Sequence, residues 1–493
     1  MNMNIPQYRI LWTWDLGSNW DISIGSKIRG SSGKNFRREA FLNDYKRMVD
    51  FASRHHFNGI VIWGALRAHN DGVAQLKELV KYGREKGVRI LPGVSAFSYG
   101  GVFYDPTEQV AWGIDRQFGS HPYSLNTWLT KHPEYVSVDE NGKPYPFGPM
   151  NILACPSRPE NLEWFREALS WLYDEFDIDG IQVEVGDYSV CHCPLCEERR
   201  KNRKIKRDYS VEDMVNTYRA ALEVSKAKKP DAWVICETYS GFTYPKDRQV
   251  DGNWQSMPVE DRKLLSDLPE DAILQWAADK AVGGYATEYW AEEIYTPMAN
   301  NILRVHAGSQ YATNGPADWG VELIWQLVAE ARRHHVNGVS IFGEESFLAP
   351  PNEANYLAFE EACGLGRDNP ELSIEKFYSD SLDPLYGGPG MAETWRNLYI
   401  KGRILMLGER AKEMPLSRQP LANLTDDPDF TEKAIGYDDG QKIALLEEHF
   451  NQVHEILCSL KAASVETKGR WIWLENDLRN MIYLVSTKSD HSN

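Results

Sequence analysis

The residues at positions 179–196, DGIQVEVGDYSVCHCPLC, combine several groups that could do chemistry. Gln182 and Glu184 alternate with apolar residues, which is the period of a strand. A helix-covered parallel strand is buried on both faces and is expected to be almost wholly apolar. A carboxylate inside such a strand therefore predicts a functional group, with Asp187 just beyond the strand end. The alternative is a buried Glu in a structural network beside an exposed loop Asp.

Three cysteines follow this strand in the pattern C-x-C-x-x-C. A fourth stands just before the helical pattern that leads into the strand. They are Cys191, Cys193, Cys196 and Cys155. Four thiolates from neighbouring loops would form a closed, tetrahedral, structural zinc site, with His192 as a substitute ligand. Free thiols or a disulfide are the alternatives. No set of histidines suits a catalytic metal, so we expect no cofactor for catalysis.

Carboxylates and aromatic residues also stand at the ends of other β-rich runs. Carboxylate pairs supply an acid and a base or nucleophile for glycosidic cleavage, and aromatic faces suit the C–H faces of sugars. The catalytic candidates are Glu184, Asp187, Glu237 and Glu344. The candidates for substrate contact are Trp12, Trp14, Asp15, Trp63, Tyr188, Tyr239, Trp276, Asp279 and His306.

Several of these residues have a structural alternative. The two tryptophans near the N-terminus, Trp12 and Trp14, share a strand face and could simply fill a core. His306 could be a satisfied core histidine. Glu237 shares its face with large apolar residues, which leaves its inward placement open. Glu344 would point inward with Ser340, whereas its neighbour in sequence would then belong to the following loop.

Eight β-rich runs alternate with helical patterns and must position these groups. They are Arg9–Asp15, Gly59–Ala65, Val88–Ser95, Gly180–Val185, Ala232–Tyr239, Ala272–Asp279, Ile302–Ala307 and Gly338–Glu344. Eight β-then-α units predict an α/β fold, a (β/α)8 TIM barrel whose active site lies at the carboxyl ends of the strands. A doubly wound open sheet is the alternative, but no G-x-G-x-x-G follows the first run.

The remainder of the chain is expected to be accessory. Residues 96–158, rich in Gly, Pro, Tyr and Trp, predict an elaborated loop after strand three. Beyond residue 365 only helical patterns remain. We therefore expect a barrel catalytic domain over 1–365 and a helical C-terminal domain over 366–493, which could also mediate a homo-oligomer.

Composition excludes several classes of protein. The chain has 54 Lys and Arg against 71 Asp and Glu, a net charge of −17. Such a charge repels phosphate backbones and anionic lipids, so we expect neither nucleic acid nor membrane as a partner. An odd count of seven cysteines argues against a disulfide scaffold. With no apolar leader at the N-terminus, we expect a cytoplasmic protein.

Two segments also resemble a known group. ACPSRPENLEW followed by GIQVEVGDYSVCHCPLCEERR is similar to uncharacterised glycoside-hydrolase-like TIM barrels related to bacterial α-glucuronidases. EKFYSDSLDPLYGGPGMAETW resembles the start of their helical C-terminal domain. The resemblance implies that Asp187 stands where that group places its strand-four acid. Asp187, with the glycine before it, also resembles the G-D-E motif of β-hexosaminidases. Tyr188 stands where those enzymes have the glutamate.

These observations predict a glycoside hydrolase, exo-acting on a small oligosaccharide or glycoside. Glu184 or Asp187 would donate the proton, and Glu344 or Glu237 would be the base or nucleophile. Because strand seven offers no nucleophile, inversion is slightly favoured. A carbon–carbon lyase or isomerase would need a Schiff-base lysine, for which only Lys280 is placed. A sugar-binding barrel without activity is the remaining alternative.

Overall fold

The computed structural model describes residues 5–14, 38–66, 72–98, 100–103, 121–144, 146–147, 151–185, 190–202, 211–241, 259–277, 298–305, 319–334, 336–343, 347–365, 373–408, 415–416, 419–420, 425–427 and 429–489.

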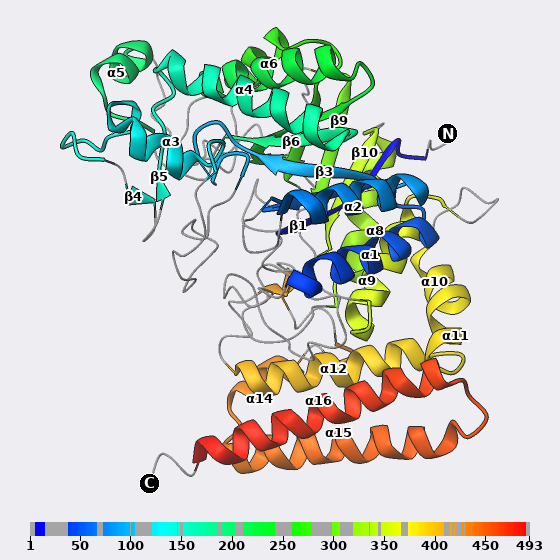
Figure 1. The fold of residues 1–493 in the computed structure, drawn as a ribbon. Helices are drawn as coiled ribbons and strands as arrows, with labels where there is room; N and C mark the ends of the chain where they lie inside the picture. Colours follow the sequence, from blue (N-terminus) through cyan, green and yellow to red (C-terminus); the bar gives the residue numbers. More distant parts are fainter. Residues whose placement is uncertain are drawn as a thin grey trace. The chain divides into compact units, whose positions relative to one another are not determined.

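Eight parallel strands close into a barrel in the order β1-β10-β9-β8-β7-β6-β3-β2 (Figure 1). The strands are β1 (Tyr8–Trp14), β2 (Gly59–Trp63), β3 (Arg89–Val94), β6 (Gly180–Glu184), β7 (Trp233–Gly241), β8 (Ile273–Ala277), β9 (Asn300–Val305) and β10 (Gly338–Phe342). Each overlaps one of the eight predicted runs. The closed order confirms the predicted (β/α)8 TIM barrel and excludes the open sheet.

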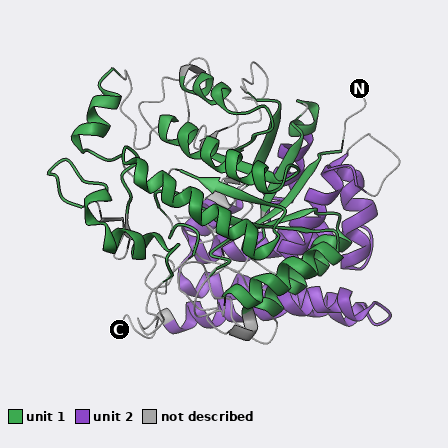
Figure 2. Ribbon diagram, turned by 45° about the horizontal axis from the view of Figure 1, so that its top comes forward, with its two compact units in different colours: residues 1, 3–306, 330–346 green, residues 2, 307–329, 347–493 purple. Residues whose placement is uncertain are grey.

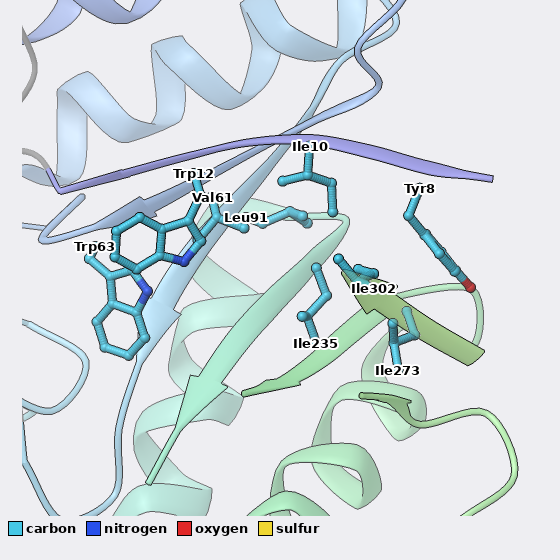
Figure 3. Close-up of a cluster of buried hydrophobic side chains, with 9 residues drawn as sticks. All are labelled: Tyr8, Ile10, Trp12, Val61, Trp63, Leu91, Ile235, Ile273 and Ile302. Atoms are coloured by element: carbon cyan, nitrogen blue, oxygen red, sulfur yellow. The ribbon is translucent and has the colours of Figure 1, made fainter. Parts of the chain in front are cut away.

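The strands alternate between side chains that fill the barrel and side chains on its outer face. The inward cluster contains Tyr8, Ile10, Trp12, Val61, Trp63, Leu91, Ile235, Ile273 and Ile302, all at most 5% exposed (Figure 3). These residues recur at every second position of their strands, as the pleat requires. The amino-terminal half of the barrel is therefore a packed core, and the interior becomes polar towards the carboxyl ends of the strands.

Helices follow the strands along the chain. They are α1 (Arg38–Arg54), α2 (Gly72–Glu85), α4 (Pro159–Phe176), α5 (Pro194–Arg200), α6 (Val211–Lys228), α7 (Val259–Arg262) with the 3-10 turn η4 (Lys263–Asp267), α8 (Val321–Arg333) and α9 (Pro350–Ala362). Their buried residues have helical spacing: on α1, Tyr45, Met48 and Val49 are fully buried. α4 begins with Pro159 in its first turn, as predicted.

The elaborated segment after β3 contains short elements. They are α3 (Leu125–Lys131), the 3-10 turn η3 (Pro133–Tyr135) and the antiparallel pair β4 (Pro146–Phe147) and β5 (Asn151–Ile152). Ser124 caps α3 by accepting a hydrogen bond from the amide of Thr127 at 3.4 Å. Val136 and Ala154 form a further antiparallel bridge. The bridge places the residue that follows η3 beside Ala154, the neighbour of Cys155 in the sequence.

Helices dominate the C-terminal part of the chain. They are α10 (Ile374–Phe377), the π-helical turn η6 (Tyr378–Leu382), α11 (Asp383–Tyr386), α12 (Met391–Leu407), α14 (Phe430–Ile435), α15 (Asp439–Ser459) and α16 (Val465–Ser489), with the two-residue strands β11 (Pro415–Leu416) and β12 (Gln419–Pro420). Helices α12, α15 and α16 pack on one another (Figure 1). The structure thus contains the expected helical C-terminal region.

The chain divides into two compact units (Figure 2). Unit 1 comprises residues 1, 3–306 and 330–346, and unit 2 comprises residues 2, 307–329 and 347–493. All eight barrel strands belong to unit 1. The assignment of catalysis to residues 1–365 and of an accessory role to residues 366–493 stays a prediction. In the described part of the chain, no helix is long and apolar enough to cross a membrane.

Candidate active site

Two buried glutamates lie side by side near the carboxyl ends of neighbouring barrel strands. Glu184 on β6 pairs in register with Glu237 on β7, which in turn pairs with Gln275 on β8. All three side chains are fully buried. Partners in a parallel register point to the same side of a sheet, and the contacts below place that side inside the barrel. The fold therefore brings two of the four catalytic candidates together in one row.

Glu237 is held by a cation and an amide. Its Oε2 lies 2.8 Å from Nη1 of Arg304 and accepts a hydrogen bond from Nε2 of Gln275 at 2.5 Å. The hydroxyl of Ser340 donates in turn to Oε1 of Gln275 at 3.1 Å. A buried carboxylate is tolerated when it is paired and hydrogen-bonded in this way. These contacts settle the open question about the orientation of Glu237: it points into the barrel.

Arg304 is a site residue that the sequence reasoning missed. It lies on β9, is 2% exposed, and its guanidinium carbon lies 5.5 Å from the ring centroid of Trp12. The sequence held a signal for this residue. Arg304 interrupts the otherwise apolar run ILRV two residues after Ile302, and residues two apart on a strand point to the same face. A buried arginine on such a strand predicts a buried carboxylate partner.

Two tryptophans and a glutamine form the neighbouring part of the interior. Nε1 of Trp12 and Nε1 of Trp63 both donate to Oε1 of Gln182, at 2.6 and 2.8 Å. Figure 3 shows the two indoles together at one end of the core cluster. They are 2% and 0% exposed, which matches the core-filling alternative for Trp12. A Cβ at Gly93 would lie only 2.4 Å from the Trp63 ring, so this position on β3 requires glycine.

The side-chain amide nitrogen of Gln182 is available for a further hydrogen bond. Its Nε2 is buried and has no hydrogen-bond partner in the part of the chain that the structure describes. Buried polar nitrogens without a protein partner are normally satisfied by water or by a ligand. Gln182 and Glu184 stand on the same strand face, two residues apart. The barrel interior therefore presents a hydrogen-bond donor beside its carboxylate row.

Trp276 lies on the outer face of β8 and is not part of this interior. It alternates with the inward Gln275, and its Nε1 donates to Oδ1 of Asn301 at 2.9 Å. The guanidinium carbon of Arg262 lies 4.7 Å from its ring centroid. The structure thus separates Trp276 from Trp12 and Trp63, with which the sequence grouped it.

Several candidates fall outside the described residues or their side chains. Asp15, Asp187, Tyr188, Asp279, His306 and Glu344 lie outside the described residues, as does Lys280. For Trp14 and Tyr239 only the strand backbone is described. Their proposed roles stay predictions.

The three cysteines of the C-x-C-x-x-C motif and the cysteine before α4 lie close together in unit 1, away from the row of Glu184, Glu237 and Gln275. The sulfur atoms of Cys155, Cys191, Cys193 and Cys196 all lie within 4.8 Å of one another. None of the seven cysteines forms a disulfide. Side-chain hydrogen bonds with Cys155 and then with Cys196 lower the pKa of Cys191. The cluster has no carboxylate among its members and is separate from the barrel row.

Comparison with known proteins gives fold-level similarity only. No protein-family model matches the sequence, and no curated protein is significantly similar to it. The solved structures that resemble it include TIM-barrel glycoside hydrolases. An O-GlcNAc hydrolase of Thermobaculum terrenum has 10% identity and a TM-score of 0.48, over 99% of this chain and 86% of that one.

Two further similar structures are also sugar-cleaving enzymes. An α-L-fucosidase of Paenibacillus thiaminolyticus has 14% identity and a TM-score of 0.41, over 72% of this chain and 49% of that one. An exo-β-N-acetylglucosaminidase of Vibrio harveyi has 11% identity and a TM-score of 0.43, over 76% of this chain and 56% of that one. Similarities this weak carry no argument about activity, and no sequence-family match supports a relationship to α-glucuronidases.

Proposed function

We propose that this protein is a glycoside hydrolase whose acid and nucleophile are Glu184 and Glu237. The observation that carries the proposal is the pairing of these two buried carboxylates in register on β6 and β7, near the carboxyl ends of the barrel strands. Active sites of (β/α)8 barrels are built at that end. Hydrolysis of a glycosidic bond by such enzymes requires one protonated and one ionised carboxyl group.

The surroundings of the two glutamates suit different roles. Glu237 contacts the guanidinium of Arg304 and the amide of Gln275, groups that would stabilise the negative charge of a nucleophile or base. Two neighbouring carboxyl groups in a buried site resist ionising together, because each charge disfavours the other. Glu184 is then the partner that keeps its proton and donates it to the leaving oxygen. We expect Nε2 of Gln182, which has no hydrogen-bond partner among the described residues, to donate to a substrate hydroxyl.

The spacing of the pair favours retention of anomeric configuration. Neighbouring strands lie about 4.8 Å apart, and the carboxyl groups of retaining enzymes are about 5–5.5 Å apart. The sequence slightly favoured inversion because strand seven offers no nucleophile, whereas the second carboxylate proposed here stands on β7, the strand next to that of Glu184. Because Glu184 and Glu237 share a register level on adjacent strands, they leave little room for an intervening water.

The finer parts of the proposal come from the sequence. We expect exo action on a small oligosaccharide. Asp187 and Tyr188 would orient the sugar, and Trp12 and Trp63 would form part of the wall of the sugar subsite. The resemblance to barrels related to α-glucuronidases adds uronic acids to the sugars to be tested. Seven cysteines without a disulfide suit a reducing compartment, in keeping with a cytoplasmic location.

The test is a panel of nitrophenyl glycosides of hexoses, pentoses and uronic acids, followed by variants on the hydrolysed substrate. Glu184→Gln keeps the shape of the side chain but removes the proton, and should slow turnover by about 10²–10⁴-fold. Glu237→Gln should be at least as damaging. Glu223→Gln, at an exposed ion pair with Arg166, is the matched control and should keep full activity.

Three further measurements distinguish the outcomes. Proton NMR of the first-formed product should show the anomer of the substrate. Exo-acting products should be monosaccharides from the first time point onwards. Unchanged turnover in both glutamine variants would contradict the assignment, and calorimetric sugar binding without turnover would instead support a sugar-binding protein.

A further inference from the structure

A compact group of four cysteine side chains in unit 1 is not used by the proposed chemistry. Cys155 precedes α4, Cys191 and Cys193 precede α5, and Cys196 lies in α5. Three of them are at most 1% exposed, and Cys193 is half-buried. We propose that these four thiolates bind a single zinc ion in a closed tetrahedral site that fastens the loop after β6 to the segment before α4.

The distances between the sulfur atoms match those of a tetrathiolate site. A zinc–sulfur bond is about 2.3 Å long, so the sulfur atoms of a regular tetrahedron are about 3.8 Å apart. The sulfur of Cys155 lies 3.6 Å from that of Cys193, 3.7 Å from that of Cys196 and 3.7 Å from that of Cys191. A disulfide would need a separation of about 2.05 Å. Three of the six sulfur–sulfur separations therefore match a zinc tetrathiolate, and all six are within 4.8 Å.

The surroundings stabilise negatively charged sulfur. The backbone amides of Val138 and Cys193 both approach the sulfur of Cys191 at 3.5 Å, in donor geometry. The hydroxyl of Ser157 lies 2.9 Å from the sulfur of Cys196. Hydrogen bonds to ligating sulfur are the usual outer contacts of thiolate metal sites, because they offset its charge. No such pattern is needed to bury four neutral thiols.

Two arginines on α5 supply nearby positive charge. Four thiolates and one Zn²⁺ carry a net charge of −2. Nη2 of Arg200 donates to the carbonyl of Cys191 at 2.7 Å, and Arg199 on the same helix forms an ion pair with the buried Asp213 of α6. Because Arg199 is also paired with Asp213 and Arg200 with Glu197, these arginines offset only part of the charge of such an anionic centre. Arg199 thereby also links the cysteine group to α6.

The fourth ligand is a thiolate rather than the imidazole of His192. Nδ1 of His192 lies 2.8 Å from a carboxylate oxygen of Glu197, on the exposed side of the segment. Four protein sulfur atoms complete a tetrahedron and leave no position for water or substrate. The ion is therefore structural: it crosslinks residues 155 and 191–196, which lie before α4 and after β6, the strand that carries Glu184.

The test begins with metal analysis of the full chain, expressed without a histidine tag and purified without chelator. Mass spectrometry of metals should find about one zinc per chain. Cys193→Ser should abolish this zinc, whereas the matched control Cys458→Ser, at an exposed cysteine on α15, should retain it. Chelation of zinc should lower the melting temperature of the wild-type chain and of the control.

A second measurement covers the case in which the Cys193 variant fails to fold. The zinc of wild-type protein is displaced with an organomercurial, the thiols are recovered, and Co²⁺ is added. One equivalent should produce the visible absorption bands of tetrahedral cobalt thiolate. The proposal would be overturned if wild-type protein is purified without zinc and does not develop these bands with Co²⁺. Iron in place of zinc, or full zinc content in a folded Cys193 variant, would also overturn it.

Discussion

At the scale of single residues, polar contacts in the barrel join strands that are far apart along the chain. Trp12 and Gln182 are separated by 170 positions, and Glu237 binds Arg304 from two strands away. Each contact satisfies a buried polar group that would otherwise be costly. Glu237 in particular depends on its partners, because an uncompensated buried charge is far more destabilising than an exposed one.

This dependence predicts a large effect for Arg304→Met. Removal of the cation leaves the Glu237 carboxylate buried with less compensation, and should lower the free energy of unfolding by about 3–5 kcal/mol. Adding Glu237→Leu should recover much of this loss, since an apolar pair replaces both charges. Urea unfolding followed by circular dichroism measures each variant, and a double-mutant cycle gives the coupling.

The matched control is the exposed ion pair of Arg166 and Glu223. Arg166→Met should cost no more than about 1 kcal/mol, because water and salt screen that pair. Equal losses in Arg166→Met and Arg304→Met, or simple additivity in the double variant, would show that the Arg304–Glu237 contact carries little energy.

At the scale of elements, the helices differ in how clearly the spacing of their buried apolar residues can be recognised in the sequence. The last helix, α16, lies in the region 366–493 that was expected to be helical, but no individual helix was assigned to its residues from the sequence. Its buried residues, Trp471, Leu474, Leu478, Met481 and Val485, are spaced by three and four positions, as one helix face requires. Exposed apolar residues such as Ile472, Tyr483 and Leu484 interrupt this pattern on the other faces. The periodicity is therefore hidden in the sequence, although packing against α15 reveals it.

Helix α15 carries a histidine that makes unit 2 sensitive to acid. Burial and, to a lesser extent, the nearby charge of Lys401 together lower the pKa of His449 to about 4. Since an unfolded histidine titrates near pH 6.5, folding excludes the proton. The contribution of His449 to stability is complete above about pH 6.5 and is lost as the pH falls through about 4, by roughly 3 kcal/mol.

His449→Gln should therefore flatten the dependence of stability on pH between about 6.5 and 4. Urea unfolding of the wild-type and variant chains over this range measures the difference. His454→Gln, at an exposed position of the same helix, is the matched control and should behave as the wild type. Parallel loss of stability in the His449 variant and the wild type would rule out this histidine as the acid-sensitive group.

At the scale of the whole molecule, the charge separates classes of partner. A net charge of −17 gives a potential that repels other polyanions and accepts neutral sugars without penalty. We expect no binding of duplex DNA or of anionic lipid vesicles even at low ionic strength, where electrostatic attraction would be strongest. Fluorescence anisotropy and vesicle sedimentation check this, with a basic protein as positive control. Salt-sensitive binding to either polyanion would contradict the expectation.

The sequence by itself determined the barrel. Strand alternation and helical spacing depend on neighbours within a few positions. The local pattern was therefore enough to predict eight strands that alternate with helices. It also identified Glu184 as an inward carboxylate and grouped the four cysteines, because Gln182 and Glu184 interrupt an apolar run and C-x-C-x-x-C is a compact motif.

Only the tertiary structure decided which of these residues meet. The register between β6, β7 and β8 places Glu184, Glu237 and Gln275 in one row, and a shift of one residue would have turned Glu237 outward. Closure of the barrel brings Arg304 to Glu237 and both indoles to Gln182. Such contacts depend on strand register and closure, which arise from packing over the whole barrel and leave no local pattern in the sequence.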